Sequence, residues 1–266
     1  MSKLSANGEP IIDMRNIVKR FPVGDSEITI LHGVSFQVYP GEFVSIVGPS
    51  GNGKSTLLNM VTGIDRPSDG EVIVTGRPVH QMSENQLAKW RGQEVGIIFQ
   101  FFQMLPSLSL LQNVMLPMEF AWMYKRAERR ERAYDLLDMV GLADQADKLP
   151  SMVSGGQQQR AAIARALATD APLLVADEPT GNLDAKTAGQ VFDLFMRLVE
   201  DQGKTMLMVT HDAELANRIP RKIEIVNGNI ASDTRHRSAP SVPAQNGALN
   251  GSANGHKVNG RQPVPA

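Results

Sequence analysis

The sequence predicts an α/β fold built around a mostly parallel sheet. Residues 172–176 and 205–209 are short and almost wholly apolar, which is typical of strands buried on both faces. Between them, apolar residues in 186–200 recur three and four positions apart, which predicts an amphipathic helix. Strands that alternate with helices in this way are joined by crossovers and run parallel.

Glycines mark the ends of other predicted strands. Residues 42–47 are expected to form a strand that leads into a glycine-rich turn, and residues 71–75 a strand flanked by glycines. Residues 222–231 predict a hairpin that turns at Asn227-Gly228, a favoured pair for a two-residue turn.

Two helices have clear end signals. Ser83 and Gln86 have the spacing of a capping box and predict a helix start. Residues 127–140 carry apolar residues on one face, and Gly141 is expected to end that helix.

Residues 95–118 lack any formal charge over 24 positions. A membrane-spanning helix needs about 20 predominantly apolar residues. Polar side chains and the prolines Pro106 and Pro117 make this interpretation unfavourable. We expect a strand, a polar loop and a short helix, in a cytoplasmic protein.

Composition narrows the function classes. The chain has 266 residues, a formal net charge of -1 and no cysteine. A strongly basic nucleic-acid binder is therefore not indicated. Disulfide scaffolds, zinc fingers, Fe–S clusters and thiol nucleophiles are excluded, and no two of the five histidines have metal-ligand spacing.

Both ends are expected to lie outside the folded domain. Residues 1–10 and 232–266 are predicted to be disordered, and residues 11–231 to form the domain. The tail is rich in Gly, Pro, Asn, Ser and Ala and has no aromatic residue, so it cannot bury enough apolar area to offset its ordering entropy. A passive tail is favoured, with lipid contact through its basic residues as the alternative.

Residues 48–55 fit the pattern G-x-x-x-x-G-K-[ST], between a predicted strand and a predicted helix. Such a loop lets backbone N–H groups surround phosphate oxygens at a helix N-terminus. Lys54 is expected to reach the β- and γ-phosphates, and the Ser55 hydroxyl to bind Mg²⁺. The predicted phosphate-binding residues are Gly48, Pro49, Ser50, Gly51, Asn52, Gly53, Lys54, Ser55 and Thr56.

Two further segments point to phosphate chemistry. The strand at 172–176 leads into Asp177, expected to hold Mg²⁺, and Glu178, expected to polarise the attacking water. The segment Ser154-Gly155-Gly156-Gln157 precedes a helix predicted over 158–167 and forms a second candidate anion site. One γ-phosphate does not need two such sites from one chain, so this one is expected to serve a neighbouring subunit.

With these motifs in place, residues 11–231 resemble the ATPase subunit of ATP-binding cassette (ABC) transporters. The resemblance implies a P-loop NTPase fold with a mostly parallel central sheet, an antiparallel β subdomain and an α-helical subdomain at about 101–165. It also implies ATP and Mg²⁺ as ligands. The matching elements are the Q-loop residue Gln100, the signature 153–157, the D-loop 181–184 with Asp184, and the switch histidine His211. The resemblance also implies that Gln100 is a further metal ligand and that Phe21 stacks on adenine.

The segments 177–184, 154–160, 57–59 and 65–67 are similar to the MacB/LolD/FtsE branch, in which the membrane partner is a mechanotransmitter. Its members serve lipoprotein release, efflux and control of wall hydrolases. Three residues depart from the usual pattern without putting activity in doubt: Asn52, Gln103 and Val153.

The resemblance implies two partners. One is a second ATPase subunit, expected as a homodimer in which Ser154 and Gly156 complete the γ-phosphate site of the other copy and Asp184 lies at the seam. The other is an integral membrane permease-like subunit, which places the chain at the cytoplasmic face of the inner membrane. Nucleic acid is not expected as a partner.

The helical insert is expected to receive a short coupling helix of the permease. Contact with that helix and simple burial are equally favoured for Phe101, Phe102, Met104 and Leu105. The basic run 125–132 is interpreted mainly as a solvated helix face, with lipid contact as the minor alternative.

Two other functions are weighed. A soluble ABC ATPase of DNA repair or translation is the main alternative, but no coiled-coil insertion and no second cassette is seen in the sequence. A nucleotide-regulated scaffold is disfavoured because a pure binder needs neither Glu178 nor His211.

Overall fold

The computed structural model describes residues 8–235. The expectations for residues 1–7 and 236–266 lie outside the described residues. The strands are β1 Ile12–Val23, β2 Ser26–Val38, β3 Phe43–Val47, β4 Asp69–Val74, β5 Arg77–Pro78, β6 Val95–Ile98, β7 Leu173–Asp177, β8 Thr205–Val209, β9 Arg221–Val226 and β10 Asn229–Arg235. The α-helices are α1 Lys54–Val61, α2 Glu84–Glu94, α3 Leu110–Phe120, α4 Arg126–Met139, α5 Gly155–Leu167, α6 Ala185–Glu200 and α7 Ala213–Arg218. The short 3-10 turns are Val79–Gln81, Ala143–Gln145 and Pro150–Met152.

The central sheet has the strand order β10-β9-β3-β8-β7-β6, and every pairing is parallel except β10 with β9. The predicted α/β fold is therefore confirmed. Strands β3, β7 and β8 are buried along almost their whole length, as their apolar runs predicted. Their carboxyl ends share one edge of the sheet, which is where a ligand binds in folds of this kind.

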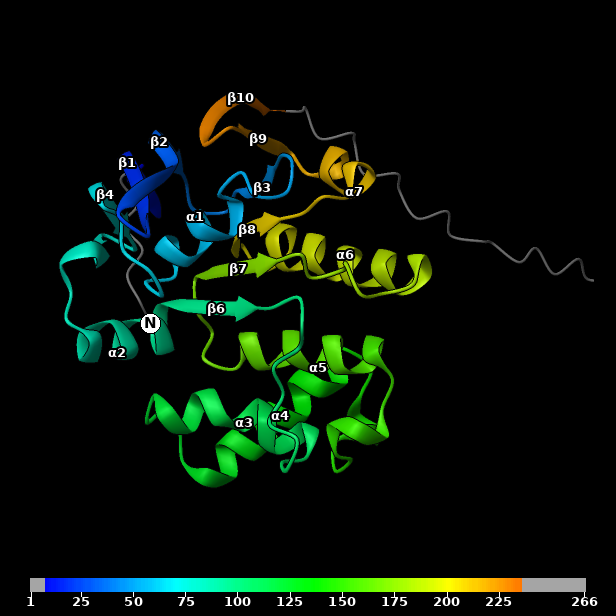
Figure 1. Ribbon diagram of the computed structural model, residues 1–266. Helices are drawn as coiled ribbons and strands as arrows, with labels where there is room; N and C mark the ends of the chain where they lie inside the picture. Colours follow the sequence, from blue (N-terminus) through cyan, green and yellow to red (C-terminus); the bar gives the residue numbers. More distant parts are fainter. Residues whose placement is uncertain (1–7, 236–266) are drawn as a thin grey trace, which may run out of the picture.

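A second, antiparallel sheet has the order β2-β1-β4-β5. It packs on the central sheet through a shared core that includes Ile12, Met14, Val44 and Ile46. This sheet positions the residues of β1 and β2 beside the β3–α1 loop. Figure 1 shows it beside α1, at the opposite end of the molecule from the helices α3 and α4.

Helices α3, α4 and α5 form a separate lobe against the edge strand β6 and against α6 (Figure 1). Its core contains Leu110, Val114, Leu137 and Ile163, all fully buried. The buried amide of Asn113 bonds to the backbone of the loop that precedes α3. The uncharged stretch thus becomes a strand, a loop and a helix, as predicted, and no helix in residues 8–235 has the length and apolar character to cross a membrane.

Two predicted boundaries are wrong. Helix α5 begins at Gly155, three residues before the predicted start, because Ser154 and Gln157 form a capping box. Strand β10 continues to Arg235, so residues 232–235 are not part of a disordered tail. The reason is a clasp in which Arg221 donates to both carboxylate oxygens of Asp233, at 2.9 and 2.7 Å.

Candidate nucleotide site and the adjacent cleft

The loop between β3 and α1 is shaped by glycine. Gly48 has φ 143° and Gly53 has φ 88°, both in the region that disfavours side chains. A β-carbon at Gly48 would lie 2.0 Å from the Ile225 carbonyl oxygen, and one at Gly53 would lie 2.7 Å from Leu31. Glycine is therefore required both for the backbone conformation and for close packing against β9 and β2.

Lys54 begins α1 and is buried, with 6% of its surface exposed. Its Nζ donates to the carbonyls of Gly48 and Pro49, each at 2.9 Å. Within residues 8–235 it makes no ion pair with a carboxylate. A buried cation without an anionic partner is costly, and phosphate is a suitable counter-charge.

Asn52, one of the three departures, has a structural role. Its amide nitrogen donates to the Pro49 carbonyl, and its amide oxygen accepts from the backbone N–H of Asn227. The residue therefore fastens the loop to the β9–β10 hairpin, whose turn at Asn227 and Gly228 has positive φ at both positions, as predicted.

Acidic residues lie at the end of β7, on the other side of the same loop. The Ser55 hydroxyl donates to Asp177 Oδ1 at 3.2 Å. Burial raises the pKa of Asp177, while the Ser55 hydrogen bond opposes that shift. Glu178 Oε2 lies 2.9 Å from His211 Nδ1, which comes from the segment after β8. The side chain of Gln100 is close by, because a β-carbon at Gly181 would lie 3.3 Å from its amide nitrogen and 3.6 Å from Glu178 Oε2.

Glu178 and the phosphate loop border a cavity of about 410 Å³, whereas Asp177, His211 and Gln100 are not among its lining residues. Phe21 stands on one side of it with its ring half-exposed and the Lys19 ammonium 4.9 Å from the ring centre. The cavity is lined by Phe21, Ile30, Ser50, Gly51, Gly53, Lys54, Ser55, Thr56 and Glu178. Ile30 is the residue that sequence reasoning missed, because nothing in the sequence showed that β2 passes this loop.

The signature segment is not part of this cavity. Ser154 lies exposed at the start of α5, and its side chain caps that helix. Asp184 caps α6 and accepts from Thr187, and these hydrogen bonds lower the pKa of Asp184. The two helix starts are in contact, since a β-carbon at Gly156 would lie 2.7 Å from Thr187. Of the predicted residues, 154–157 and Asp184 thus form a second surface, apart from the phosphate loop.

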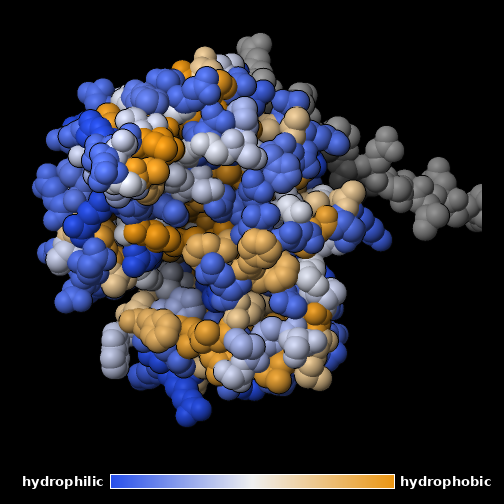
Figure 2. Space-filling model, in the orientation of Figure 1, coloured by the Kyte–Doolittle hydropathy of each residue, from blue (hydrophilic) through white to orange (hydrophobic). Residues whose placement is uncertain are grey.

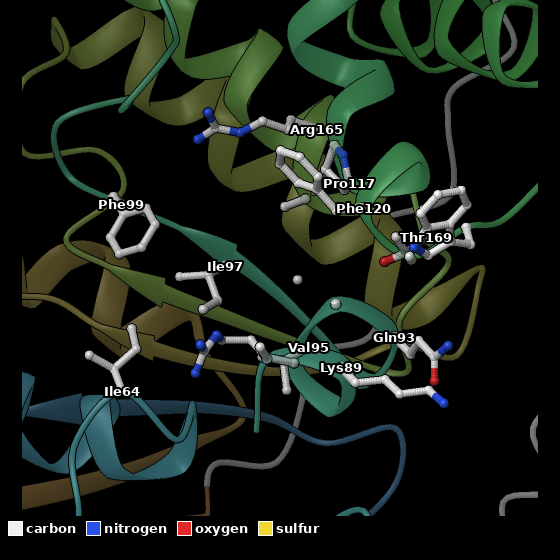
Figure 3. A pocket seen from close by; sticks show the side chains of 17 residues that line it. Ile64, Lys89, Gln93, Val95, Ile97, Phe99, Pro117, Phe120, Arg165 and Thr169 are labelled. Carbon is white, nitrogen blue, oxygen red and sulfur yellow. The ribbon is translucent and has the colours of Figure 1, made fainter. Parts of the chain in front are cut away.

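A larger cavity of about 900 Å³ lies between the central sheet and the helical lobe. Its walls come from α2, β6, the end of α3 and the end of α5, and Figure 3 shows Ile97, Phe99 and Phe120 around it. We call it the lobe cleft. It contains the cations Lys89, Arg91 and Arg165 and no carboxylate.

None of the four predicted contact residues of the insert lines this cleft. Phe101 and Leu105 are exposed elsewhere, and Met104 packs against the lobe core. Simple burial is wrong for the exposed Phe101 and Leu105, and contact of the four residues with a partner helix stays a prediction. The chain turns away from the cleft after Phe99, and Gln103 takes a positive φ. Arg165 holds this turn by donating to the carbonyls of Phe102 and Gln103.

A parallel sheet with a phosphate loop before α1 and a carboxylate beside it defines a P-loop nucleotidase. The family model for ABC transporters matches residues 31–181, more than half of the sequence, and the chain belongs to this family. An uncharacterized ABC transporter ATP-binding protein of Thermotoga maritima is 44% identical over 220 residues, 83% of this chain and 93% of its own. One of Mycobacterium tuberculosis is 39% identical over 238 residues, 90% of this chain and 96% of its own.

Solved structures agree with this assignment. The dimeric post-hydrolysis state of the ATP-binding cassette MJ0796 bound to ADP and Pi has a TM-score of 0.80 and 39% identity. The match spans the whole of that solved chain and 86% of the present one. Another dimeric structure of this bacterial ABC transporter cassette is 40% identical with the same TM-score. The chain is an ABC-type ATPase subunit that binds and hydrolyses ATP, and the soluble repair or translation alternative is not favoured.

Proposed function

We propose that the cavity beside the phosphate loop holds ATP with its adenine on Phe21 and its phosphates on the loop. The observation that carries this proposal is the buried Lys54, which makes no ion pair within residues 8–235 and lines the cavity together with the phosphate loop and Glu178. The remaining loop contacts are assigned to Gly48, Pro49, Ser50, Gly51, Asn52, Gly53, Ser55 and Thr56.

Ser55 and Asp177 suit Mg²⁺ because they bring two hard oxygen atoms within 3.2 Å of one another. Gln100 is the third proposed ligand. When bound, the ion would neutralise charge on the β- and γ-phosphates. The Ser55 hydroxyl donates a hydrogen bond to Asp177, which keeps this partly buried carboxylate satisfied.

Glu178 is proposed to orient the attacking water and accept its proton. Its N–H bonds to the Val209 carbonyl at 2.9 Å, and its backbone φ of 45° is unusual for a non-glycine residue. His211 fixes the carboxylate through its Nδ1 contact and is proposed to reach the γ-phosphate. The chain mainly positions these groups, as is general for phosphoryl transfer.

A second copy of the chain is proposed to complete each site. The exposed surface of 154–157 and Asp184 is outside the cavity within one chain, so it is available to the γ-phosphate held by another. The helix start supplies N–H groups that favour an anion. Phosphate is thus held between two protomers.

The lobe cleft is proposed to receive a short helix of an integral membrane subunit, at the cytoplasmic face of the inner membrane. Its apolar walls suit a helix face, and its three cations with no acid favour a helix that carries a carboxylate. Motion of that helix would link ATP turnover to export, lipoprotein release or mechanotransmission, as in the MacB/LolD/FtsE branch.

Two variants test the ATP site. Glu178→Gln is expected to keep ATP binding and form an ATP-dependent dimer in size-exclusion chromatography while losing turnover. Lys54→Ala is expected to lose ATP binding. A monomeric Glu178→Gln variant with ATP and magnesium present would overturn the proposed dimer, and unchanged affinity would remove Lys54 from the site.

Co-purification from solubilised membranes tests the cleft. Ile97→Arg places a charge in its wall and is expected to lose the membrane partner. Met139→Arg is the matched control, because Met139 is exposed but lies outside the cleft. Equal recovery of the partner by both variants would contradict the proposal.

A further inference from the structure

Trp122, at the corner between α3 and α4, contributes little to the packing of its own chain. Helix α3 ends in a Schellman arrangement, with the Met123 N–H bonded to the Met118 carbonyl and the Trp122 N–H to the Glu119 carbonyl. Trp122 occupies the left-handed position of this motif, with φ 54°, where glycine is normally favoured. Its side chain is 88% exposed, so the chain gains almost no apolar burial in return.

A second aromatic residue accompanies it. Phe120 is 76% exposed, and both rings lie at the rim of the lobe cleft. Figure 2 shows the cleft as a notch at the left of the view, with hydrophobic surface on its lower edge and strongly hydrophilic side chains just below. The rim therefore combines exposed aromatic groups with charge.

The charge comes from the start of α4. Lys125, Arg126 and Arg130 are exposed and make no ion pair within residues 8–235. Arg129 and Arg132 differ, because they bond to backbone carbonyls of the lobe. The three exposed cations are thus free of internal carboxylates.

Two of these cations share a groove. Arg126 and Arg130 lie one helical turn apart and line a hollow of about 340 Å³ with Leu108, Met115 and Leu116. Glu119 is the single acid among its lining residues. Arg130 also stacks on Tyr134, with its guanidinium 5.1 Å from the ring centre.

We propose that this corner, formed by Phe120, Trp122, Lys125, Arg126 and Arg130, binds the surface of a membrane that contains anionic phospholipid. Tryptophan prefers the headgroup level of a bilayer, and exposed cations are attracted to its negative surface. The inference rests on the proposed membrane partner in the lobe cleft, since Phe120 and Trp122 of the corner also line that cleft.

Lipid is favoured over a protein partner for two reasons. Arg126 and Arg130 line the hollow, but Lys125 lies outside it and is exposed, so the positive charge is not confined to a pocket that would match one carboxylate. Phe120 and Trp122 are 76% and 88% exposed although they line the cleft, so most of each ring is open to a headgroup layer and is not enclosed by the cleft wall.

The chain provides its own probe. It contains two tryptophans, Trp90 and Trp122, and Trp90 is 4% exposed and bonded to Thr75. With the full-length protein, vesicles of phosphatidylcholine with 40 mol% phosphatidylglycerol are expected to shift Trp122 emission to the blue, and brominated lipid to quench it. Phosphatidylcholine vesicles alone should do neither. Trp122→Gly should abolish the signal without loss of thermal stability, because glycine suits that backbone position.

Charge variants measured by vesicle flotation complete the test. Arg126→Ala/Arg130→Ala is expected to weaken binding by more than about tenfold, since each cation contributes roughly fivefold. The matched control Arg77→Ala/Arg197→Ala removes two exposed cations from other surfaces and should change binding little. Replacing the tail cations Arg237, Lys257 and Arg261 with serine should leave the Trp122 signal intact.

The outcomes separate this inference from the proposed function. Equal weakening by the two double variants, or binding lost only with the tail variant, overturns the lipid contact while ATP-dependent dimerisation and partner recovery remain. Emission that shifts with the membrane subunit in neutral lipid, and not with anionic vesicles, assigns the corner to a protein interface. Failure of dimerisation or of partner recovery with normal vesicle binding would overturn the proposed function instead.

Discussion

The phosphate-loop side and the helical lobe differ in how completely the chain satisfies its own groups. At the loop, most polar atoms have partners: Ser55 bonds to Asp177, Glu178 contacts His211, and Asn52 fastens the loop to the hairpin. The lobe instead presents Trp122 in a strained backbone position and exposed cations without acids. The phosphate-loop side is therefore built for a ligand that fits a preformed site, and the helical lobe for surfaces that another molecule supplies.

The largest expected effect comes from combining the two sides. A Lys54→Ala chain lacks the loop cation, and a Ser154→Arg chain lacks the proposed signature surface. Each alone should lose at least about a hundredfold in ATP turnover. A mixture should recover measurable activity, because a mixed dimer contains one site with an intact Lys54 and an intact Ser154.

Turnover assayed at a constant total protein concentration checks this expectation. Mixing Lys54→Ala with Glu178→Gln is the matched control. Both changes lie in the half of the site that carries the phosphate loop, so each site of a mixed dimer is defective. Equal recovery in both mixtures, or none in the first, would contradict a site shared between protomers.

Tight packing makes the loop intolerant of small changes. Gly48→Ala would place a methyl group 2.0 Å from the Ile225 carbonyl oxygen at a positive φ, so the loop must move. We expect a loss of at least about 2 kcal/mol in the free energy of unfolding, together with weaker ATP binding. Gly189→Ala in α6 is the control, because nothing lies within 4 Å of its β-carbon, and it should stabilise the helix by up to about 1 kcal/mol. Urea unfolding measures both, and equal midpoints would contradict the packing argument.

The sequence predicted the loop side better than the lobe for a physical reason. Phosphate loops, capping boxes and buried strands are local, so spacing alone indicated residues 48–55, Ser83 with Gln86, and β7. The hairpin β1–β2 was not assigned from its residues, because bulges between Met14 and Ile17 and again near Lys19 break the alternation of exposed and buried positions.

Contacts between distant segments could not be predicted either. Ile30 lines the nucleotide cavity only because β2 folds over the loop, and Phe102 reaches Gly155 only because the chain turns at Gln103. Of the four residues predicted for the partner contact, Phe101 and Phe102 precede that turn, and Met104 and Leu105 follow it. A positive φ at a glutamine has no reliable sequence signal, so the course of the chain after Phe99 had no local warning.

The clasp at the end of β10 gives a smaller, pH-dependent effect. The hydrogen bonds from Arg221 lower the pKa of Asp233, so the carboxylate stabilises the fold above the ordinary aspartate range and loses this contribution as pH falls through its lowered value. Asp233→Asn should therefore destabilise the protein at pH 7 by about 0.5 kcal/mol, a modest value for a pair partly open to water. The difference from wild type should shrink below pH 4.

Thermal unfolding between pH 3 and pH 7 (a range set by the ordinary aspartate pKa of about 3.9) measures this dependence. Asp193→Asn is the control, because Asp193 pairs with Arg218 at a more exposed site and its effect should be smaller. A constant difference between Asp233→Asn and wild type across the range would show that the charge of Asp233 is not what holds the end of β10.

A further small effect has the opposite sign and lies in the lobe. Trp122→Gly should raise the free energy of unfolding by up to about 1 kcal/mol, because glycine takes the left-handed C′ position without the steric cost that any β-carbon brings. Trp122→Ala is the matched control: it removes the exposed ring but keeps the β-carbon, and should change stability little. If alanine stabilises the chain as much as glycine, the cost lies in the exposed ring and not in the backbone. If neither variant raises the free energy of unfolding, Trp122 does not destabilise the fold. Its left-handed backbone position would then be no argument that the lobe is shaped to contact another molecule.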